Sequence, residues 1–356
     1  MTQKWKENII KIKPYKAGEQ PKGDGVIKLN ANENPYPPAP GVGALLRGVG
    51  SDRLRRYPQI DGAELRRALA REYGLDSASV FVSNGSDEVL ALAFRGFFNS
   101  DKPVLFPSIT YSFYPVWCEL FGIPFRRVAL GPDLRIHPCD YRSENGGVII
   151  ANPNAPTGIA LDISEIDEIV SANTGSVVIV DEAYVDFGAR SSVELISKYE
   201  NLLIVQTFSK GRSLAGLRLG MAFGSPELIS VLDTVKNSFN SYPVDSIASA
   251  VGVVSLGEKA YFEMRARQVI ATRERVSAAL RKMGFSLTDS AANFLFITHA
   301  DLSAAELLEY LRARGILVRH FSAPETERYL RVSIGTDAEM DGFLSAVSDF
   351  LQKGKQ

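Results

Sequence analysis

The chain has 356 residues, with 40 basic and 41 acidic side chains and 45% hydrophobic residues. This length is enough to bury the cores of one large domain and one smaller domain. The balanced charge gives no sign of a nucleic-acid-binding surface, so we expect the partners to be small molecules or copies of the same chain.

Cysteine and histidine usage limits the chemistry further. The two cysteines, Cys118 and Cys139, are too few for a disulfide framework, which is typical of a reducing compartment. His137, His299 and His320 lie far apart in the sequence, so no metal site is predicted. The start of the chain has no signal-peptide pattern, and no apolar run is long enough to span a membrane. We therefore expect a cytoplasmic protein without membrane contact.

In chain order, residues 1–40 are rich in proline and asparagine, which indicates an extended arm with a part in the smaller domain. From residue 41 to 257, short apolar runs alternate with helix-like segments, as in a mostly parallel central sheet covered by helices. The runs carry valine and isoleucine on both alternate positions, which is typical of strands buried on both faces. These runs are residues 79–85, 103–108, 146–153, 176–184, 202–210 and 218–225.

Residues 258–356 begin with a long charged helix pattern whose apolar positions lie three and four apart. The runs "ANFLFITH", "GILVRHF" and "YLRVSIGT" follow, with a helix from about Ser303 to Arg314 and a closing amphipathic helix. The pattern predicts a small α+β domain, so the fold class is α/β with a large domain and a small α+β domain.

Ligands of open α/β sheets bind at the carboxyl ends of the strands, where four groups of polar residues stand out. In "VSNGSDE" a strand ends at Val82 and a helix begins near Ser86. This arrangement can hold a phosphate, or it can be an ordinary helix start in which Ser86 or Asp87 supplies the cap or the first-turn charge. The turn "NPNAPTG", residues 152–158, directly follows a buried strand and can equally be a plain loop.

The third group is Asp181, which follows a β-branched run and can cap a helix or face a protonated ring nitrogen. The fourth is "TFSKGRSLAGLRLG", in which Ser209 and Arg218 suit a phosphate and Lys210 can condense with an aldehyde. Together the four groups match the needs of pyridoxal 5'-phosphate.

The motifs "LNANENPYPP", "RYP", "SNGSDE", "PSITYSFY", "NPNAPTG", "DEAYVDF", "SKGRSLAGLRLG" and "LRVSIGT" occur in this order over nearly the whole chain. In these motifs the sequence resembles the fold-type I pyridoxal-phosphate aminotransferases, and among them the histidinol-phosphate group. The resemblance implies transamination in two half-reactions with ping-pong kinetics, 2-oxoglutarate as acceptor, a place in histidine biosynthesis, and a homodimer with shared active sites. Aromatic amino acid aminotransferases and threonine-phosphate decarboxylases share this framework and stay open as alternatives.

The resemblance also implies roles for individual residues. Lys210 would bind the cofactor aldehyde, Asp181 would pair with the ring nitrogen, and Tyr184 would hydrogen-bond the phenolic oxygen. The other implied cofactor contacts are Gly85, Ser86, Asp87, Tyr111 stacked on the ring, Asn154, Ser209, Arg218, and Tyr57 from the second subunit. The implied substrate contacts are Tyr15, Asn32, Arg319 and Arg331, with Tyr15, like Tyr57, completing the neighbour's site.

Two departures from the family pattern affect these roles. Ala155 stands where relatives commonly carry an asparagine that donates to the phenolic oxygen. Either Asn154 makes that contact after a small backbone change, or Tyr184 supports the oxygen alone. The second departure is Arg212, which we expect to face solvent.

Two other classes of protein fit less well. A cofactor-binding transcriptional regulator would need a DNA-binding helix-turn-helix before the fold, for which the extended arm leaves no room. A nicotinamide dehydrogenase would need Gly-x-Gly-x-x-Gly after a first strand, and "GVGALLRG" lacks both the third glycine and the strand.

Overall fold

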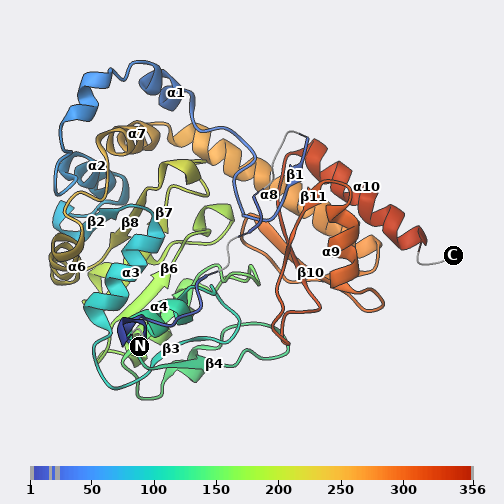
Figure 1. Ribbon diagram of the computed structural model, residues 1–356, viewed down its shortest axis with the longest axis horizontal. Helices are drawn as coiled ribbons and strands as arrows, with labels where there is room; N and C mark the ends of the chain where they lie inside the picture. The colour runs from blue at the N-terminus through green and yellow to red at the C-terminus, as the bar shows by residue number, and fades with distance from the viewer. Residues whose placement is uncertain (1–3, 16–17, 21–24, 354–356) are drawn as a thin grey trace.

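The computed structural model describes residues 4–15, 18–20 and 25–353 of the chain. Its largest sheet has seven strands in the order β2-β8-β7-β6-β5-β3-β4 (Figure 1). Neighbouring strands are parallel, except that β8 runs antiparallel to both β2 and β7. The strands are β2 (Val80–Ser83), β3 (Val104–Pro107), β4 (Phe125–Val128), β5 (Gly147–Ala151), β6 (Val178–Asp181), β7 (Leu202–Thr207) and β8 (Gly220–Phe223). The prediction of a mostly parallel central sheet is confirmed.

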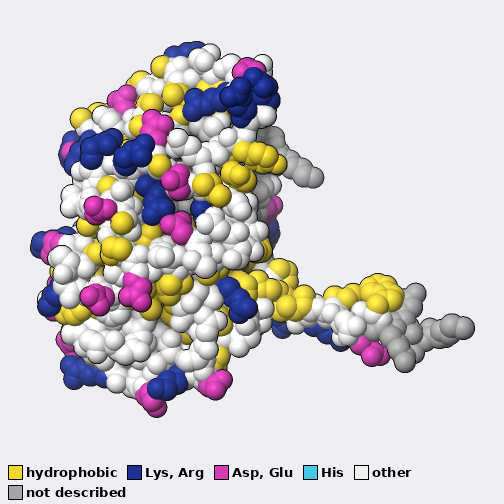
Figure 2. Space-filling view, turned by 90° about the vertical axis from the view of Figure 1, so that its left-hand side faces the viewer, with side chains coloured by type: hydrophobic (Ala, Val, Ile, Leu, Met, Phe, Trp, Pro, Cys, Tyr) yellow, Lys and Arg dark blue, Asp and Glu magenta, His cyan; other side chains and the backbone are white. Residues whose placement is uncertain are grey.

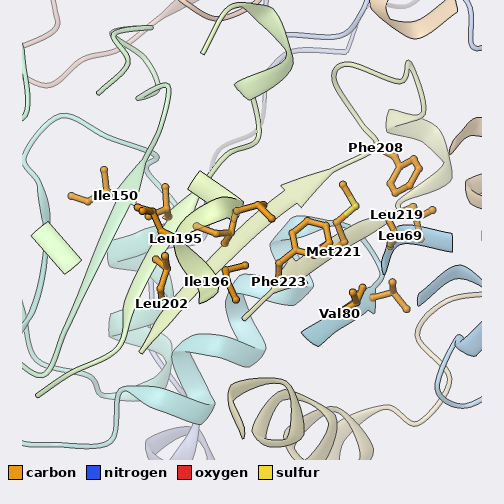
Figure 3. Packing of buried hydrophobic residues seen from close by; sticks show 14 of the residues in the cluster. Leu69, Val80, Ile150, Leu195, Ile196, Leu202, Phe208, Leu219, Met221 and Phe223 are labelled. Carbon is orange, nitrogen blue, oxygen red and sulfur yellow. The ribbon is translucent and has the colours of Figure 1, made fainter. Parts of the chain in front are cut away.

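Helices cover both faces of this sheet, so successive strand residues enter two different hydrophobic cores. In β6, Val178 and Val180 join one core while Ile179 joins the other. Figure 3 shows part of the first core, where Phe208 and Leu219 pack beyond the end of β7. Its helices are α2 (Ala63–Tyr73), α5 (Ile163–Ala172) and α7 (Ser246–Gly257), and those of the second core are α3 (Ser86–Phe97), α4 (Tyr114–Phe121) and α6 (Pro226–Phe239).

The edge strand β4 is the one strand of the sheet that the sequence did not predict. Its residues are Phe125, Arg126, Arg127 and Val128, and the two arginines are exposed. An edge strand pairs on one side only, and charged side chains there discourage pairing with other chains. A strand of this kind therefore lacks the apolar pattern that reveals a central strand.

After α7 the chain enters α8 (Lys259–Lys282), which leads from the large sheet to a second, antiparallel sheet of order β12-β13-β10-β9 (Figure 1). Residues of α8 and of this sheet share a third core with the last two helices. The elements are β9 (Phe285–Leu287), β10 (Phe294–His299), α9 (Ala304–Arg312), β12 (Arg319–His320), β13 (Leu330–Ser333) and α10 (Asp337–Lys353). This arrangement agrees with the predicted α+β part.

The run "GILVRHF" forms two short strands that belong to different sheets. Its first half, β11 (Ile316–Leu317), pairs in parallel with β1 (Ile27–Lys28) of the N-terminal segment, and its second half is β12. The N-terminal segment is thereby attached to the smaller part of the molecule. The remaining elements are α1 (Pro40–Arg47) and the 3-10 turns η1 (Lys4–Asn8), η2 (Ser51–Arg55), η3 (Ser77–Ser79), η4 (Pro138–Tyr141), η5 (Val185–Phe187), η6 (Ser192–Ser197) and η7 (Ala215–Leu217).

Within the described residues, no helix is both long enough and apolar enough to cross a membrane.

Candidate active site

A cavity lies at the carboxyl ends of the parallel strands, where the last residues of β5, β6 and β7 reach its wall. The wall also includes residues of the α3 N-terminus, the N-terminal segment and the smaller sheet. Among the predicted site residues it contains Tyr15, Asn32, Ser86, Asp87, Tyr111, Asp181, Tyr184, Ser209, Lys210, Arg218, Arg319 and Arg331. The fold thus brings together residues that are far apart in the sequence. For example, the Asn32 N–H donates to Ser333 Oγ at 2.8 Å, although the two residues are 301 positions apart.

Lys210 follows β7 by three residues, in a turn that is fastened to the N-terminal segment. Its Nζ donates to the carbonyl oxygen of Ala31 at 3.2 Å, and Asn34 Nδ2 donates to the Lys210 carbonyl oxygen at 3.0 Å. Burial, with the Arg331 charge adding to it, lowers the pKa of Lys210 to about 8. A substantial share of the amine is therefore neutral near pH 8, which is the form that attacks an aldehyde. Asn34 was not singled out from the sequence, although it lies in the quoted motif "LNANENPYPP".

Asp181 is the last residue of β6 and is 5% exposed. Its Oδ2 accepts a hydrogen bond from Tyr114 Oη at 2.9 Å, and its Oδ1 accepts one from the Ala183 N–H at 3.2 Å. Burial raises the pKa of Asp181 to about 6, and these hydrogen bonds oppose that rise. A cation placed beside this carboxylate would stabilise its charged form.

Tyr184 lies close to Lys210 and is held by the N-terminal segment. Asn32 Nδ2 donates to Tyr184 Oη at 3.0 Å, and Lys210 Nζ lies 5.9 Å from the centre of the Tyr184 ring. Burial raises the pKa of Tyr184, so its hydroxyl stays protonated and can donate a hydrogen bond into the cavity.

The N-terminus of α3 has the features of a phosphate site. Gly85 caps the helix with a φ of 82°, and no side chain caps the first turn. Neither Ser86 nor Asp87 caps the helix, although Asp87 does supply a charge in its first turn. The first backbone N–H groups of the helix therefore point out of it without intrahelical acceptors. The Arg218 guanidinium lies beside these N–H groups. It is so close to Gly85 that a Cβ added to Gly85 would come within 2.6 Å of Arg218 Nη2.

Asp87 contacts this site through its carboxylate, which makes two polar contacts. Tyr111 Oη donates to Asp87 Oδ1 at 2.9 Å, and Arg218 Nη2 donates to Asp87 Oδ2 at 3.2 Å. A carboxylate would repel a phosphate, so the Asp87 side chain is not expected to bind it. Asp87 would instead offer its backbone N–H to the phosphate, while its carboxylate orients Arg218. Ser209 completes the wall, and its Oγ accepts a hydrogen bond from Thr207 Oγ1 at 2.9 Å.

Asn154 does not line the cavity, which removes it from the predicted contacts with the phenolic oxygen. Both N–H groups of its amide are used inside the protein, on the Ile109 carbonyl oxygen at 2.9 Å and on Thr157 Oγ1 at 3.1 Å. Its Oδ1 accepts from Thr110 Oγ1 at 2.8 Å. Ala155 stands at the wall in its place, so the alternative in which Tyr184 supports the oxygen alone agrees with the geometry.

Arg212 is 8% exposed, so the expectation that it faces solvent is wrong. Its Nη1 donates to the Ser255 carbonyl oxygen near the end of α7 at 2.9 Å, and its guanidinium lies 4.4 Å from the centre of the Phe262 ring. The Arg212 charge also opposes the effect of burial on Asp186, whose pKa is raised to about 6. Arg212 thus connects the Lys210 turn to the junction of α7 and α8, which sequence spacing alone does not show.

Two arginines of the smaller sheet, Arg319 and Arg331, also line the cavity. Arg331 Nη2 donates to the Asn30 carbonyl oxygen at 3.0 Å, and its buried Nε has no acceptor among the described residues. The ring of Phe321 lies 5.7 Å from the guanidinium carbon of both Arg331 and Arg319. Phe321 also lines the cavity and was not singled out from the sequence.

Tyr15 lines the cavity of its own chain, which contradicts the expectation that it completes the neighbour's site. Its ring stacks on Phe113 at 4.5 Å with an interplanar angle of 19°. Two polar contacts hold the following residues on the same chain: Asn30 Nδ2 donates to the Glu19 carbonyl oxygen at 2.8 Å, and Arg312 pairs with the Glu19 carboxylate. Glu19, like Tyr15, therefore contacts residues of its own chain.

Tyr57 does not line the cavity of its own chain. Its side chain is 82% exposed and stacks on Tyr242, with ring centres 4.7 Å apart. An exposed aromatic residue can contribute to a site only through a second molecule, so the contribution of Tyr57 to a neighbour's site stays a prediction.

The residues present fit pyridoxal 5'-phosphate group by group. The α3 N-terminus with Arg218 and Ser209 suits the phosphate, Lys210 suits the aldehyde, and Asp181 suits a protonated ring nitrogen. Tyr184 offers a protonated hydroxyl for the phenolic oxygen. The fold and this site together define a pyridoxal-phosphate-dependent enzyme of the aminotransferase type.

Comparisons with known proteins agree with this class. The family model for aminotransferase class I and II matches residues 24–347. A histidinol-phosphate aminotransferase from Lactococcus lactis subsp. cremoris (strain MG1363) is 47% identical over 348 residues, covering 98% of each chain. One from Acinetobacter baumannii (strain SDF) is 48% identical over 338 residues, covering 94% of each chain.

The solved structure of histidinol-phosphate aminotransferase from Sinorhizobium meliloti in complex with pyridoxal-5'-phosphate has the same fold. Its TM-score is 0.83 at 23% identity, over 92% of this chain and 90% of that one. The chain belongs to the aminotransferase class I and II family and, within it, to the histidinol-phosphate aminotransferases.

Proposed function

We propose that this enzyme transfers the amino group of histidinol phosphate to 2-oxoglutarate in histidine biosynthesis, with the site residues in the roles given below. The names of the relatives at 47% and 48% identity support this substrate. The observation that carries the proposal is one cavity whose wall holds the Lys210 amine together with three arginines, Arg218 beside the α3 N-terminus and Arg319 and Arg331 of the smaller sheet. Arg218 suits the phosphate of the cofactor, and the other two arginines suit an anionic group of the substrate.

When bound, the cofactor supplies an aldehyde that takes up the amino group and a protonated ring that withdraws electrons from the substrate Cα–H bond. Lys210 would bind the aldehyde, and its free amine would take the Cα proton as a general base because its pKa is lowered to about 8. Asp181 would keep the ring nitrogen protonated, and the Tyr184 hydroxyl would donate a hydrogen bond to the phenolic oxygen. Tyr111, which lines the cavity, would cover one face of the ring.

The far end of the substrate would contact Arg331, Arg319 and Tyr15. Burial lowers the pKa of Arg331, yet the group remains cationic, and an anion at its unpartnered Nε would satisfy a buried donor. Planar guanidinium groups suit both a phosphate monoester and the second carboxylate of glutamate, so one pair of arginines can serve both half-reactions.

The test is the absorbance spectrum of the purified protein with pyridoxal phosphate. We expect a yellow band that histidinol phosphate or glutamate bleaches and 2-oxoglutarate restores. Arg331→Ala should raise the amount of histidinol phosphate needed for bleaching by about a hundredfold, the equivalent of one lost charged contact. Arg328→Ala, at an exposed arginine near the same sheet, is the matched control and should behave as wild type.

The alternatives predict different results in the same experiment. An aromatic amino acid aminotransferase would be bleached mainly by phenylalanine. A threonine-phosphate decarboxylase would release CO2 from threonine phosphate and would need no 2-oxo acid. Either result would replace histidinol phosphate as the substrate, while absence of the band would remove the cofactor.

We further propose a cytoplasmic homodimer whose active sites each use Tyr57 of the other subunit. The free thiols Cys118 and Cys139 suit a reducing compartment. Figure 2 shows a narrow extension with hydrophobic side chains that leaves the main body, and Trp5, Ile9 and Ile10 of the N-terminal segment are 60%, 50% and 61% exposed. A second copy would cover this apolar surface.

We also propose that the chain divides into an arm (1–40), a large domain (41–257) and a small domain (258–356). The boundary after residue 257 coincides with the end of α7 at Gly257.

A further inference from the structure

The carboxylate of Asp181 depends on a single side chain for its position. Its two oxygens accept from Tyr114 Oη at 2.9 Å and from the Ala183 N–H at 3.2 Å. Within the described part of the chain, no basic side chain forms a salt bridge with Asp181. The side-chain donor Tyr114 is therefore the one group that a conservative substitution can remove without touching the carboxylate.

Tyr114 is built into the second hydrophobic core and cannot readily turn away. It is the first residue of α4 and is 0% exposed. The rings of Phe94, Phe106 and Tyr111 surround it, with centres 6.2, 5.9 and 5.7 Å away, and Tyr111 meets it edge to face at 89°. Since Tyr111 also lines the cavity, Tyr114 lies directly behind the cavity wall.

The hydroxyl of Tyr114 has a fixed protonation state. Burial and the neighbouring Asp181 charge raise its pKa far above the ordinary value for tyrosine. It can therefore donate its proton in a hydrogen bond to Asp181 but cannot take up a proton from it in the neutral pH range. A permanent donor to a carboxylate favours the ionised carboxylate.

We propose that Tyr114 is a positioning residue of the reaction, which holds the Asp181 carboxylate in place and ionised so that it can keep the ring nitrogen of the cofactor protonated. This inference rests on the proposed role of Asp181. The residue lies in the quoted motif "PSITYSFY", where the sequence directed attention to Tyr111.

The expected pH dependence follows from the charges around Asp181. Burial raises the pKa of Asp181 most, and the Asp87 charge on α3 raises it further. The hydrogen bonds from the Tyr114 hydroxyl on α4 and from the Ala183 N–H lower this pKa. Tyr184, which follows β6, is close enough for its own pKa to respond to the Asp181 charge. Protonated Asp181 has no charge with which to hold the ring N–H, so cofactor affinity falls as the pH falls through the pKa of Asp181. Loss of the Tyr114 hydroxyl raises that pKa, and the loss of affinity then begins at a higher pH.

The experiment compares the wild type with Tyr114→Phe, which keeps the ring. We expect the acid limb of kcat and of pyridoxal-phosphate affinity to move up by about one pH unit. With the Asp181 pKa starting from about 6, kcat at pH 6.5 should then fall about threefold with little change in KM. An unshifted acid limb in a folded Tyr114→Phe protein would overturn the proposal.

Two control variants separate this effect from a general loss of core stability. Tyr141→Phe removes a buried hydroxyl that has no partner in the described structure. Tyr73→Phe removes a tyrosine hydrogen bond of 2.6 Å to Gln206 Oε1, in which Asp181 takes no part. Both controls should keep the wild-type pH profile, and the same shift in Tyr73→Phe would contradict a specific role for Tyr114.

A cofactor analogue with carbon in place of the ring nitrogen gives a readout that does not depend on activity. Without the ring N–H, wild type and Tyr114→Phe should bind the analogue equally, whereas their affinities for pyridoxal phosphate should differ. An equal loss of affinity for both molecules would show a merely structural role. If the wild type forms no yellow band with pyridoxal phosphate, the proposed function fails instead.

Discussion

At the scale of single residues, the chemistry of this site comes from ordinary side chains in unusual surroundings. Lys210 and Asp181 are both enclosed, and the same physical cause, loss of water, favours the neutral form of each. For the lysine this makes a nucleophile available near neutral pH. For the aspartate, the loss of water makes a protonated ring nitrogen a favourable partner, because a nearby cation stabilises the ionised carboxylate.

Replacing Lys210 with alanine should abolish turnover, with a loss of at least about 10⁴-fold, since both the covalent attachment and the proton carrier are removed. The fold should persist, because the only polar contact of the amine is to the Ala31 carbonyl oxygen in the described structure. Steady-state kinetics and circular dichroism check the two parts. An unfolded variant would instead indicate a structural lysine.

The lowered pKa of Lys210 predicts how fast the apoprotein takes up the cofactor at different pH values. The neutral amine increases as the pH rises and is half formed at a pH of about 8. We therefore expect the rate of appearance of the yellow band in stopped-flow mixing to rise between pH 6 and 8 and to level off above about 9. A rate that keeps rising to pH 10 would mean an ordinary, solvated lysine.

At the scale of elements, the site depends on a close approach between β8 and the start of α3. A Cβ added to Gly220 would come within 2.3 Å of the Gly85 carbonyl carbon and of the Ser86 nitrogen. Both contacts are backbone atoms, which cannot turn aside as a flexible side chain can. Glycine is therefore needed at this position for packing, and the position of the phosphate site depends on it.

Gly220→Ala should move the N-terminus of α3 and lower pyridoxal-phosphate affinity by at least about tenfold, with a loss of stability of about 1–3 kcal/mol. Cofactor titration and thermal unfolding of the apoprotein measure these effects. Gly216→Ala is the matched control, because a Cβ there meets no atom within 4 Å. Equal behaviour of the two variants would argue against the tight approach.

Elements also differ in how well the sequence reveals them. The central strands were predicted because burial on both faces requires apolar residues at every position, as in the β5 run "GVIIA". The edge strand β4 is half exposed and has no such pattern. The run "GILVRHF" looked like one strand, yet β1 pairs with its first half and β13 with its second.

At the scale of the whole molecule, the proposed homodimer can be tested by mixing subunits. If each site uses Lys210 of one subunit and Tyr57 of the other, a hybrid of Lys210→Ala and Tyr57→Ala subunits contains one intact site. Random reassociation of equal amounts should then restore about a quarter of wild-type activity. Mixtures that stay as inactive as the parent proteins would contradict shared sites, and sedimentation provides the control for dimer formation.

The sequence by itself determined the class of fold and the positions of most strands along the chain, because these follow from local patterns. Its motifs also predicted Lys210, Asp181, Tyr184 and Arg218 as site residues, and all four line one cavity. Only the tertiary structure decided the surroundings of particular side chains. Arg212 is buried against Phe262, the Asn154 amide is used by Ile109 and Thr157, and Tyr15 returns to its own cavity.

The physical reason is the same in each case. A sequence pattern reports the average environment of a segment, whereas these contacts join segments that are far apart along the chain. Tyr114 and Asp181 are separated by 67 positions, and no local signal connects them. Only the packing of α4 against the end of β6 brings the hydroxyl within hydrogen-bond distance of the carboxylate.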